Sequence, residues 1–313
     1  METLDELILK KVDRLTTVPD ALLSGISKSE LEALKKIQEL IKELKTSGGY
    51  IIQSEENLRI ASEIVDKLKQ VFYGGQYIDA VASFANEFDN QVGISNQYFE
   101  RAFDSFTIDQ FAIASAKAAK KTAVELLVSA LPDTELFNPI KSVLEEAVSS
   151  GARYLDTLDA LQPYLSGKDG GALSRYATTY AHDTFAIADR SYTNVVSDHV
   201  NAVWFKYSGG TVKHTRPFCL ERHEKYFHYK EIEGWVEGKR VAGERTPDSS
   251  GKWAGMVEGT SKQTIFTYAG GWNCRHSIIP VSAIRVPEEV LLRNIQSGNF
   301  KPTDKEKRLL KIN

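Results

Sequence analysis

The first 200 residues repeat apolar side chains every three or four positions. This spacing places them on one face of a helix, and it is interrupted at Pro19 and at the glycine pairs Gly48-Gly49 and Gly74-Gly75. We expect one helix from Leu4 that stops before Pro19, and a second that opens at the capping box Ser27-Lys-Ser-Glu30. The pattern further predicts a short strand or extended turn at Tyr50, helices at residues 54–71, 77–129, 140–149, 152–165 and 172–199, breaks at Gly93, Pro132 and Pro139, and a loop at residues 166–171.

The periodicity changes after Asn201. Val203-Trp-Phe-Lys-Tyr207 alternates as a strand does, and residues 231–238 and 264–268 are expected to form further short strands. Residues 234–259 are rich in Gly, Lys, Glu and Ser, which predicts an exposed loop or β-excursion. The predicted fold class is therefore α+β, with a mostly helical N-terminal body followed by a small β-rich C-terminal unit.

The length of 313 residues exceeds one average domain. We expect a helical body at residues 1–170, a long helix with a small β unit at residues 171–286, and a basic C-terminal tail at residues 287–313. The end of the tail carries Lys301, Lys305, Lys307, Arg308 and Lys311. A polar, basic chain end is more typical of a disordered or partner-bound arm than of a core element.

The composition of the chain bears on its possible partners. A net charge of −3, with 42% hydrophobic and 26% charged residues, is ordinary for a globular protein and gives no general attraction to nucleic acid. The longest apolar runs fall far short of the roughly 20 residues that cross a bilayer, so no membrane partner is expected. The acidic first residues argue against a secretory signal, and two cysteines make no disulfide framework and indicate a reducing compartment.

Both cysteines and four of the six histidines lie between His214 and His276. Cys219-x-x-x-His223 and Cys274-x-His276 each place a thiol near an imidazole, and two thiolates with two imidazoles suit tetrahedral zinc. The candidate metal ligands are therefore Cys219, His223, Cys274 and His276, and zinc is the candidate cofactor. Two other interpretations stay open, namely buried thiols beside surface histidines and a functional disulfide.

Catalysis has weaker support in the sequence. The Cys/His pairs lack an accompanying oxyanion-hole pattern or a third orienting group, and we identify no phosphate-binding loop or dinucleotide fingerprint. His182 and Asp183 are neighbours on the long predicted helix, so they point in different directions and are expected to be a surface pair. The sequence therefore predicts no catalytic residues and a protein that is not an enzyme.

The segments around the cysteines follow the order of a known family. They are a Thr-x-Pro-x-Cys turn at Thr215-Arg-Pro-Phe-Cys219, a step into a strand at Lys225-Tyr-Phe227, and a closing strand at Asn273-Cys-Arg-His276 and Ile278-Ile-Pro280. With the long helix before them, residues 172–286 resemble the phage Mu F-like minor head protein domain, also described as the phage head morphogenesis domain. The chain departs from that pattern at Arg216, where many members have a first cysteine, and at His276, which replaces the final cysteine.

The resemblance implies a non-enzymatic virion structural protein. Members of the family are minor head (minor capsid) components that associate with the portal and act in head assembly. The implied partners are the phage portal protein and the major capsid protein, and the implied location is the phage head, assembled in the host cytoplasm. The mixed cysteine and histidine set leaves the binding of zinc open.

Two alternative functions stay open. Some proteins with this head domain are fused to toxin domains, so an ADP-ribosyltransferase-like effector is one alternative. Its candidate residues are Glu231-Ile-Glu233 and Ser249-Ser250. The other alternative is a DNA-contacting protein packaged in the head, which would use the basic tail together with Arg216, Arg222 and Arg275.

Overall fold

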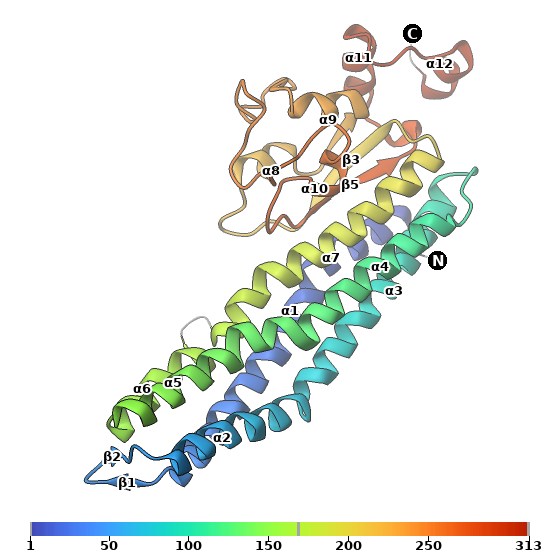
Figure 1. Cartoon of the computed structure of the whole chain (residues 1–313). Coiled ribbons are helices and arrows are strands. Elements are labelled where there is room, and N and C mark those ends of the chain that lie inside the picture. Colours follow the sequence, from blue (N-terminus) through green and yellow to red (C-terminus); the bar gives the residue numbers. More distant parts are fainter. Residues whose placement is uncertain (1, 168–169, 312–313) are drawn as a thin grey trace. The chain divides into compact units, whose positions relative to one another are not determined.

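The computed structural model describes residues 2–167 and 170–311, and most of them are helical (Figure 1). The α-helices are α1 (Leu4–Leu40), α2 (Glu55–Tyr73), α3 (Gln76–Ala102), α4 (Gln110–Glu125), α5 (Asn138–Ser150), α6 (Tyr154–Leu165), α7 (Ala172–His199), α8 (Pro217–Arg222), α9 (Tyr229–Trp235), α10 (Ile265–Tyr268), α11 (Glu288–Gln296) and α12 (Asp304–Leu310). The strands are β1 (Thr46–Ser47), β2 (Tyr50–Ile51), β3 (Trp204–Gly209), β4 (Lys225–His228) and β5 (His276–Val281). With 66% helix and a small antiparallel sheet near the C-terminus, the predicted α+β class is confirmed.

The chain divides into two compact units, each discontinuous in sequence. Unit 1 comprises Met1–Thr17, Phe88–Ala119 and His182–Asn313, and unit 2 comprises Val18–Glu87 and Lys120–Ala181. The division predicted from the sequence, into residues 1–170, 171–286 and 287–313, stays a prediction. The loop expected at residues 166–171 includes residues 168 and 169, which lie outside the described residues. Among the helices that are described, none combines the length and apolar character needed to cross a membrane.

The β1–β2 hairpin of unit 2 is held by one amide side chain. Ser54 caps α2 by accepting a hydrogen bond from the N–H of Asn57. The buried side chain of Asn57 then bonds the backbone of Lys45 and Ile52 through three hydrogen bonds of 2.7 to 2.9 Å. Because β2 begins at Tyr50 and pairs with β1, the strand interpretation of this segment is confirmed.

The helix breaks predicted at Pro19 and Gly93 are wrong. Helix α1 continues through Pro19, and α3 continues through Gly93. An internal proline removes one backbone donor at a cost of about 3 kcal/mol, and an internal glycine costs about 1 kcal/mol. The apolar stripe around Pro19 is buried at Leu15, Val18 and Leu22, so burial of these side chains offsets the cost of the proline.

The prolines at positions 132 and 139 do not end the helical run either. The backbone stays helical from residue 110 to residue 150, with π-helical segments at Leu126–Ala130 and Asp133–Phe137. In a π turn an amide bonds the carbonyl five residues earlier, as Asn138 does with Asp133. At the predicted interruption the helix therefore widens locally into π turns next to the prolines, which have no amide N–H to donate.

The sheet of unit 1 has β3 in the middle, with the order β4-β3-β5 and antiparallel pairing throughout. Phe205 of β3 lies opposite Phe227 of β4 and Pro280 of β5. The strand predicted to begin at Val203 is thus confirmed as β3. All six residues of β5 are buried, as expected of a strand that is covered on both faces. We call residues 202–286 the β unit.

The strands predicted at residues 231–238 and 264–268 are wrong, because these segments contain helices α9 and α10. His228 and Glu231 form a capping box that starts α9. The apolar run that follows is short enough to fit a helix or a strand, so the capping box decides between them. The segment predicted as an exposed loop or excursion, residues 234–259, folds back as turns that bury Trp253.

The expectation that the tail is an arm and not a core element is also wrong for its first part. Val290 and Leu291 of α11 are buried in a cluster with Trp204 of β3. Arg293 adds an ion pair with Glu231 at 2.8 Å. The apolar positions of α11 recur at helical spacing, so they bury one face, whereas the lysines of α12 stay exposed.

A buried ion pair joins the helices of unit 1 to the sheet. Lys11 of α1 donates to Asp189 of α7 and, at 2.6 Å, to Ser95 of α3. Asp189 also accepts hydrogen bonds from Gln91 of α3 at 2.9 Å and from Ser277 of β5 at 3.3 Å. The charge of Lys11 is therefore paired and its ammonium group makes hydrogen bonds to two partners, which is the condition under which a buried pair is tolerated.

Candidate functional site

Helix α8 places the first cysteine of the candidate site. Pro217 lies in the first turn of α8, where the missing N–H has no intrahelical partner to lose. Cys219 follows in the same short helix and is 2% exposed. The helix ends before His223, whose backbone leaves the helical region and leads the chain into β4.

The second pair of candidate ligands comes from the chain before β5 and from its first residue. Cys274 closes a turn by donating its N–H to the carbonyl of Gly271 at 3.1 Å. His276 then begins β5 opposite Gly209 of β3. The pairing of β5 with β3 therefore brings the two predicted segments together, although Cys219 and Cys274 are 55 positions apart.

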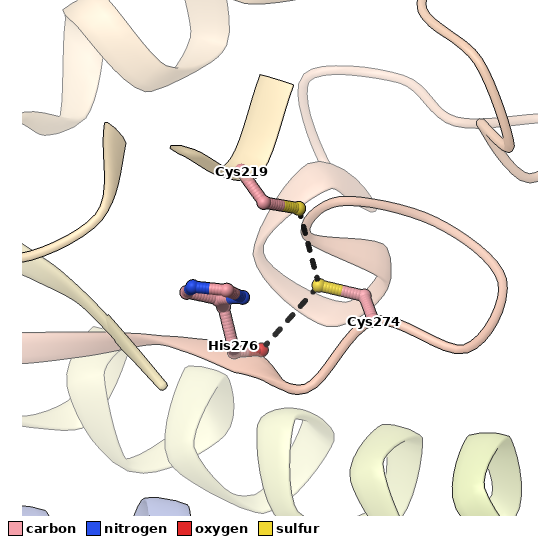
Figure 2. Close-up of side chains that lie close together, drawn as sticks. All are labelled: Cys219, Cys274 and His276. Carbon is pink, nitrogen blue, oxygen red and sulfur yellow. Dashed lines mark hydrogen bonds between the residues drawn. The ribbon is translucent and has the colours of Figure 1, made fainter. Parts of the chain in front are cut away.

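Three of the four predicted residues form one cluster, shown in Figure 2. The sulfurs of Cys219 and Cys274 point toward each other and lie 3.8 Å apart. These two sulfurs and a ring nitrogen of His276 all lie within 4.8 Å of one another. Cys274 and His276 are 4% and 1% exposed, so the cluster is closed to bulk water.

His223 reaches this cluster through the other histidine. Its Nδ1 lies 3.2 Å from Nε2 of His276, and its side chain is only partly buried. Burial and the neighbouring His276 ring lower the pKa of His223, which favours the neutral imidazole. A neutral imidazole is the form that binds metals. The assignment of these four residues as metal ligands stays a prediction.

Two residues of the site were missed by the sequence analysis. The hydroxyl of Tyr207 on β3 lies 3.3 Å from the sulfur of Cys219 and 3.6 Å from that of Cys274. Gly270 packs its backbone against the same atoms, because a Cβ there would overlap the sulfur of Cys219 and lie 2.8 Å from that of Cys274. The Gly270-Gly271 pair is thus a close-approach site as well as a turn.

A buried arginine of α7 holds the segment that carries the second cysteine. Arg190 donates through Nε to the carbonyl of His276 at 2.8 Å, and through a terminal nitrogen to the carbonyl of Cys274. It is 2% exposed. An arginine on a helix with polar neighbours carries no local signal of this role, so it cannot be singled out from the sequence alone.

The two thiols differ in acidity. The hydrogen bond between the two sulfurs and the charge of Arg190 lower the pKa of Cys274, although burial opposes them. The same hydrogen bond, together with burial, raises the pKa of Cys219. Burial also raises the pKa of Tyr207, so its hydroxyl stays a hydrogen-bond donor to sulfur. Cys274 is therefore the more acidic thiol of the pair.

The surface placement expected for His182 and Asp183 is wrong, because both are buried in unit 1. Asp183 accepts a hydrogen bond from the N–H of Asn273, the residue before Cys274. Burial raises the pKa of Asp183 to about 6. The carboxyl group therefore positions the turn before β5, and α7 supports the cluster at Asp183 as well as at Arg190.

Residues suggested for the alternative functions have structural partners in the β unit. Glu231 caps α9 and pairs with Arg293. Arg222, suggested for DNA contact, is fully buried and pairs with Glu244 at 2.8 Å. The side chain of Arg222 is thus not available to DNA, and that part of the DNA interpretation is wrong.

The arrangement can hold a metal or two paired thiols, and its burial gives a substrate little access to either sulfur. Comparison of the chain with family models, with curated proteins and with solved structures finds no match.

Proposed function

We propose that the chain is a non-enzymatic minor head (minor capsid) protein of a bacteriophage, associated with the portal and acting in head assembly. The proposal rests on one observation. The sequence segments that resemble the head morphogenesis domain correspond to elements of one sheet region, namely α8, β4 and the start of β5, which surround the central strand β3. The three segments thus lie together in one sheet region, as a resemblance to a single domain requires.

The use of the reactive side chains supports a structural role. Cys219 and Cys274 are buried and face each other. The carboxyl groups of Glu231 and Asp183 bond the backbone of nearby turns and helices. Groups that hold the fold in this way are poorly placed to bind a substrate, which needs an accessible cavity with polar groups directed into it.

The proposed partners are the portal protein and the major capsid protein. The experiment is quantitative mass spectrometry of purified phage particles and of proheads from a phage that encodes this chain. We expect the protein in both preparations at low copy number relative to the major capsid protein. We also expect a deletion to reduce the yield of filled heads, and a complemented deletion to recover it.

Absence of the protein from particles and from proheads would contradict the proposal. A matched control is the Arg59→Met variant, which alters an exposed ion pair of α2 and should enter heads normally. NAD hydrolysis by the purified chain that is lost in Glu233→Gln would instead support the effector alternative.

A further inference from the structure

We propose that Cys219, Cys274 and His276, completed by His223, bind one zinc ion that cross-links the β unit. The inference rests on the geometry of these side chains and is independent of a role in a phage head. It extends the proposed function by assigning a ligand to the cluster.

Two distances in the cluster fit a tetrahedral zinc ion. With Zn–S bonds of about 2.3 Å and Zn–N bonds of about 2.0 to 2.1 Å, tetrahedral geometry separates two sulfurs by about 3.8 Å and two nitrogens by about 3.3 to 3.4 Å. The sulfurs of Cys219 and Cys274 lie 3.8 Å apart, and the facing nitrogens of His223 and His276 lie 3.2 Å apart. These pairs have the lengths of two opposite edges of the ligand tetrahedron.

The other edges close by movement of the histidine rings. Around zinc, a sulfur and a nitrogen lie about 3.5 Å apart. A ring nitrogen of His276 is already within 4.8 Å of both sulfurs. His223 lies just after α8 and is partly exposed, so its side chain can rotate toward the cluster, and its exposed side gives the ion a way in.

The donor set selects zinc among common ions. Magnesium and calcium prefer oxygen ligands, whereas thiolates with imidazoles suit zinc. Two thiolates neutralise the charge of the ion, which matters in a site where three ligands are 4% exposed or less. Four protein ligands leave no open position, which is the arrangement of structural zinc sites.

The residues around the ligands support the two thiols and the backbone of His276. The hydroxyl of Tyr207 can donate to either thiolate, and its ring stacks on His276 with centroids 5.0 Å apart. Arg190 fixes the carbonyls on both sides of residue 275. Gly270 leaves room for the sulfurs because it has no Cβ. Such supporting contacts typically change metal affinity by about 10- to 100-fold when they are removed.

The test is metal analysis of the full-length purified chain by native mass spectrometry and elemental analysis. We expect close to one zinc per chain, and a thiolate-to-cobalt charge-transfer band with tetrahedral d–d absorption after exchange with cobalt. Cys219→Ser and Cys274→Ser should each bind at least tenfold less zinc. Tyr207→Phe should keep the ion but release it to a chelator about 10- to 100-fold more readily.

The matched control is His214→Ala, which removes an exposed histidine near the site and should retain a full zinc equivalent. Because a cysteine variant can fail to fold, the native mass of the unmodified chain before and after chelation decides the question independently. A folded chain without zinc, both after purification and after incubation with excess zinc, would overturn the proposal. A mass 2 Da below that of the reduced chain, which marks a disulfide, would overturn it as well.

Discussion

Helix α2 and the β unit bury their side chains by different means. Helix α2 buries an aliphatic stripe that includes Ile60, Ile64 and Leu68 and repeats at helical spacing. The core of the β unit instead contains both cysteines, three tryptophans and the guanidinium of Arg222. Packing of aliphatic stripes depends mainly on volume, whereas arginine and thiol contacts depend on direction. The core of the β unit should therefore tolerate substitution less well than the aliphatic stripe of α2.

The largest expected difference is at Arg222. Its guanidinium lies 3.9 Å from the ring centroid of Phe218 and 4.5 Å from that of Trp235, and it pairs with Glu244. Arg222→Met leaves the carboxylate of Glu244 buried without its partner, so we expect a loss of about 3–5 kcal/mol in the free energy of unfolding.

Tryptophan fluorescence during urea unfolding measures this loss selectively, because all four tryptophans lie in the β unit. Arg59→Met in α2 is the control, since its ion pair with Glu63 is exposed and contributes only about 0.3–0.5 kcal/mol. Equal losses in the two variants would contradict the comparison.

The second difference is a pH dependence at His228. This buried residue makes an edge-to-face contact with the ring of Trp204 and caps α9, and burial lowers its pKa to about 4 from an ordinary value of 6.5. The folded state disfavours protonation of the His228 ring, so the neutral ring contributes to stability. This contribution is complete above pH 6.5 and is lost as the pH falls toward 4. The loss amounts to about 2–3 kcal/mol.

NMR titration of the His228 ring checks the pKa. His228→Asn should be less stable than the unmodified chain at pH 7, and the gap should narrow as the pH approaches 4. A gap that is independent of pH would show that the ring acts through packing alone.

The third comparison sets two glycines against each other. Gly270→Ala would push a methyl group against both sulfurs, and overpacking of this kind costs about 1–3 kcal/mol. Gly93→Ala in α3 meets nothing within 4 Å and should stabilise the protein by about 0.5–1 kcal/mol. Opposite signs in thermal unfolding support the comparison, and a loss at both positions would argue against it.

The contrast between local packing patterns and long-range directional contacts also explains which features the sequence could predict. The period of apolar residues is a local property, so α7 and the central strand β3 were found near their true ends. The two cysteine segments were found because cysteine and histidine are rare and clustered. The breaks predicted at Pro19 and Gly93 are wrong because the sequence shows a helix-breaking residue but not the burial of the side chains around it. Burial of those side chains stabilises the helix by more than the breaking residue costs.

Arg190 and Tyr207 could not be found in this way. Arg190 bonds carbonyls 84 and 86 positions away, and no window along α7 contains its partners. Tyr207 is one of several aromatic residues in its strand, and only the pairing of β3 with β5 shows which of them meets the sulfurs. Sites assembled by long-range pairing are visible in sequence only through their rare residues.

The strand order β4-β3-β5 has a consequence for synthesis of the chain. The first partner of β3, strand β4, follows within about 20 residues, whereas β5 follows only after about 70. During translation one edge of the central strand therefore waits several seconds for its partner at typical elongation rates of about 5–20 residues per second. An unpaired edge invites pairing with other chains, so the nascent protein is most exposed to aggregation between the emergence of β4 and that of β5.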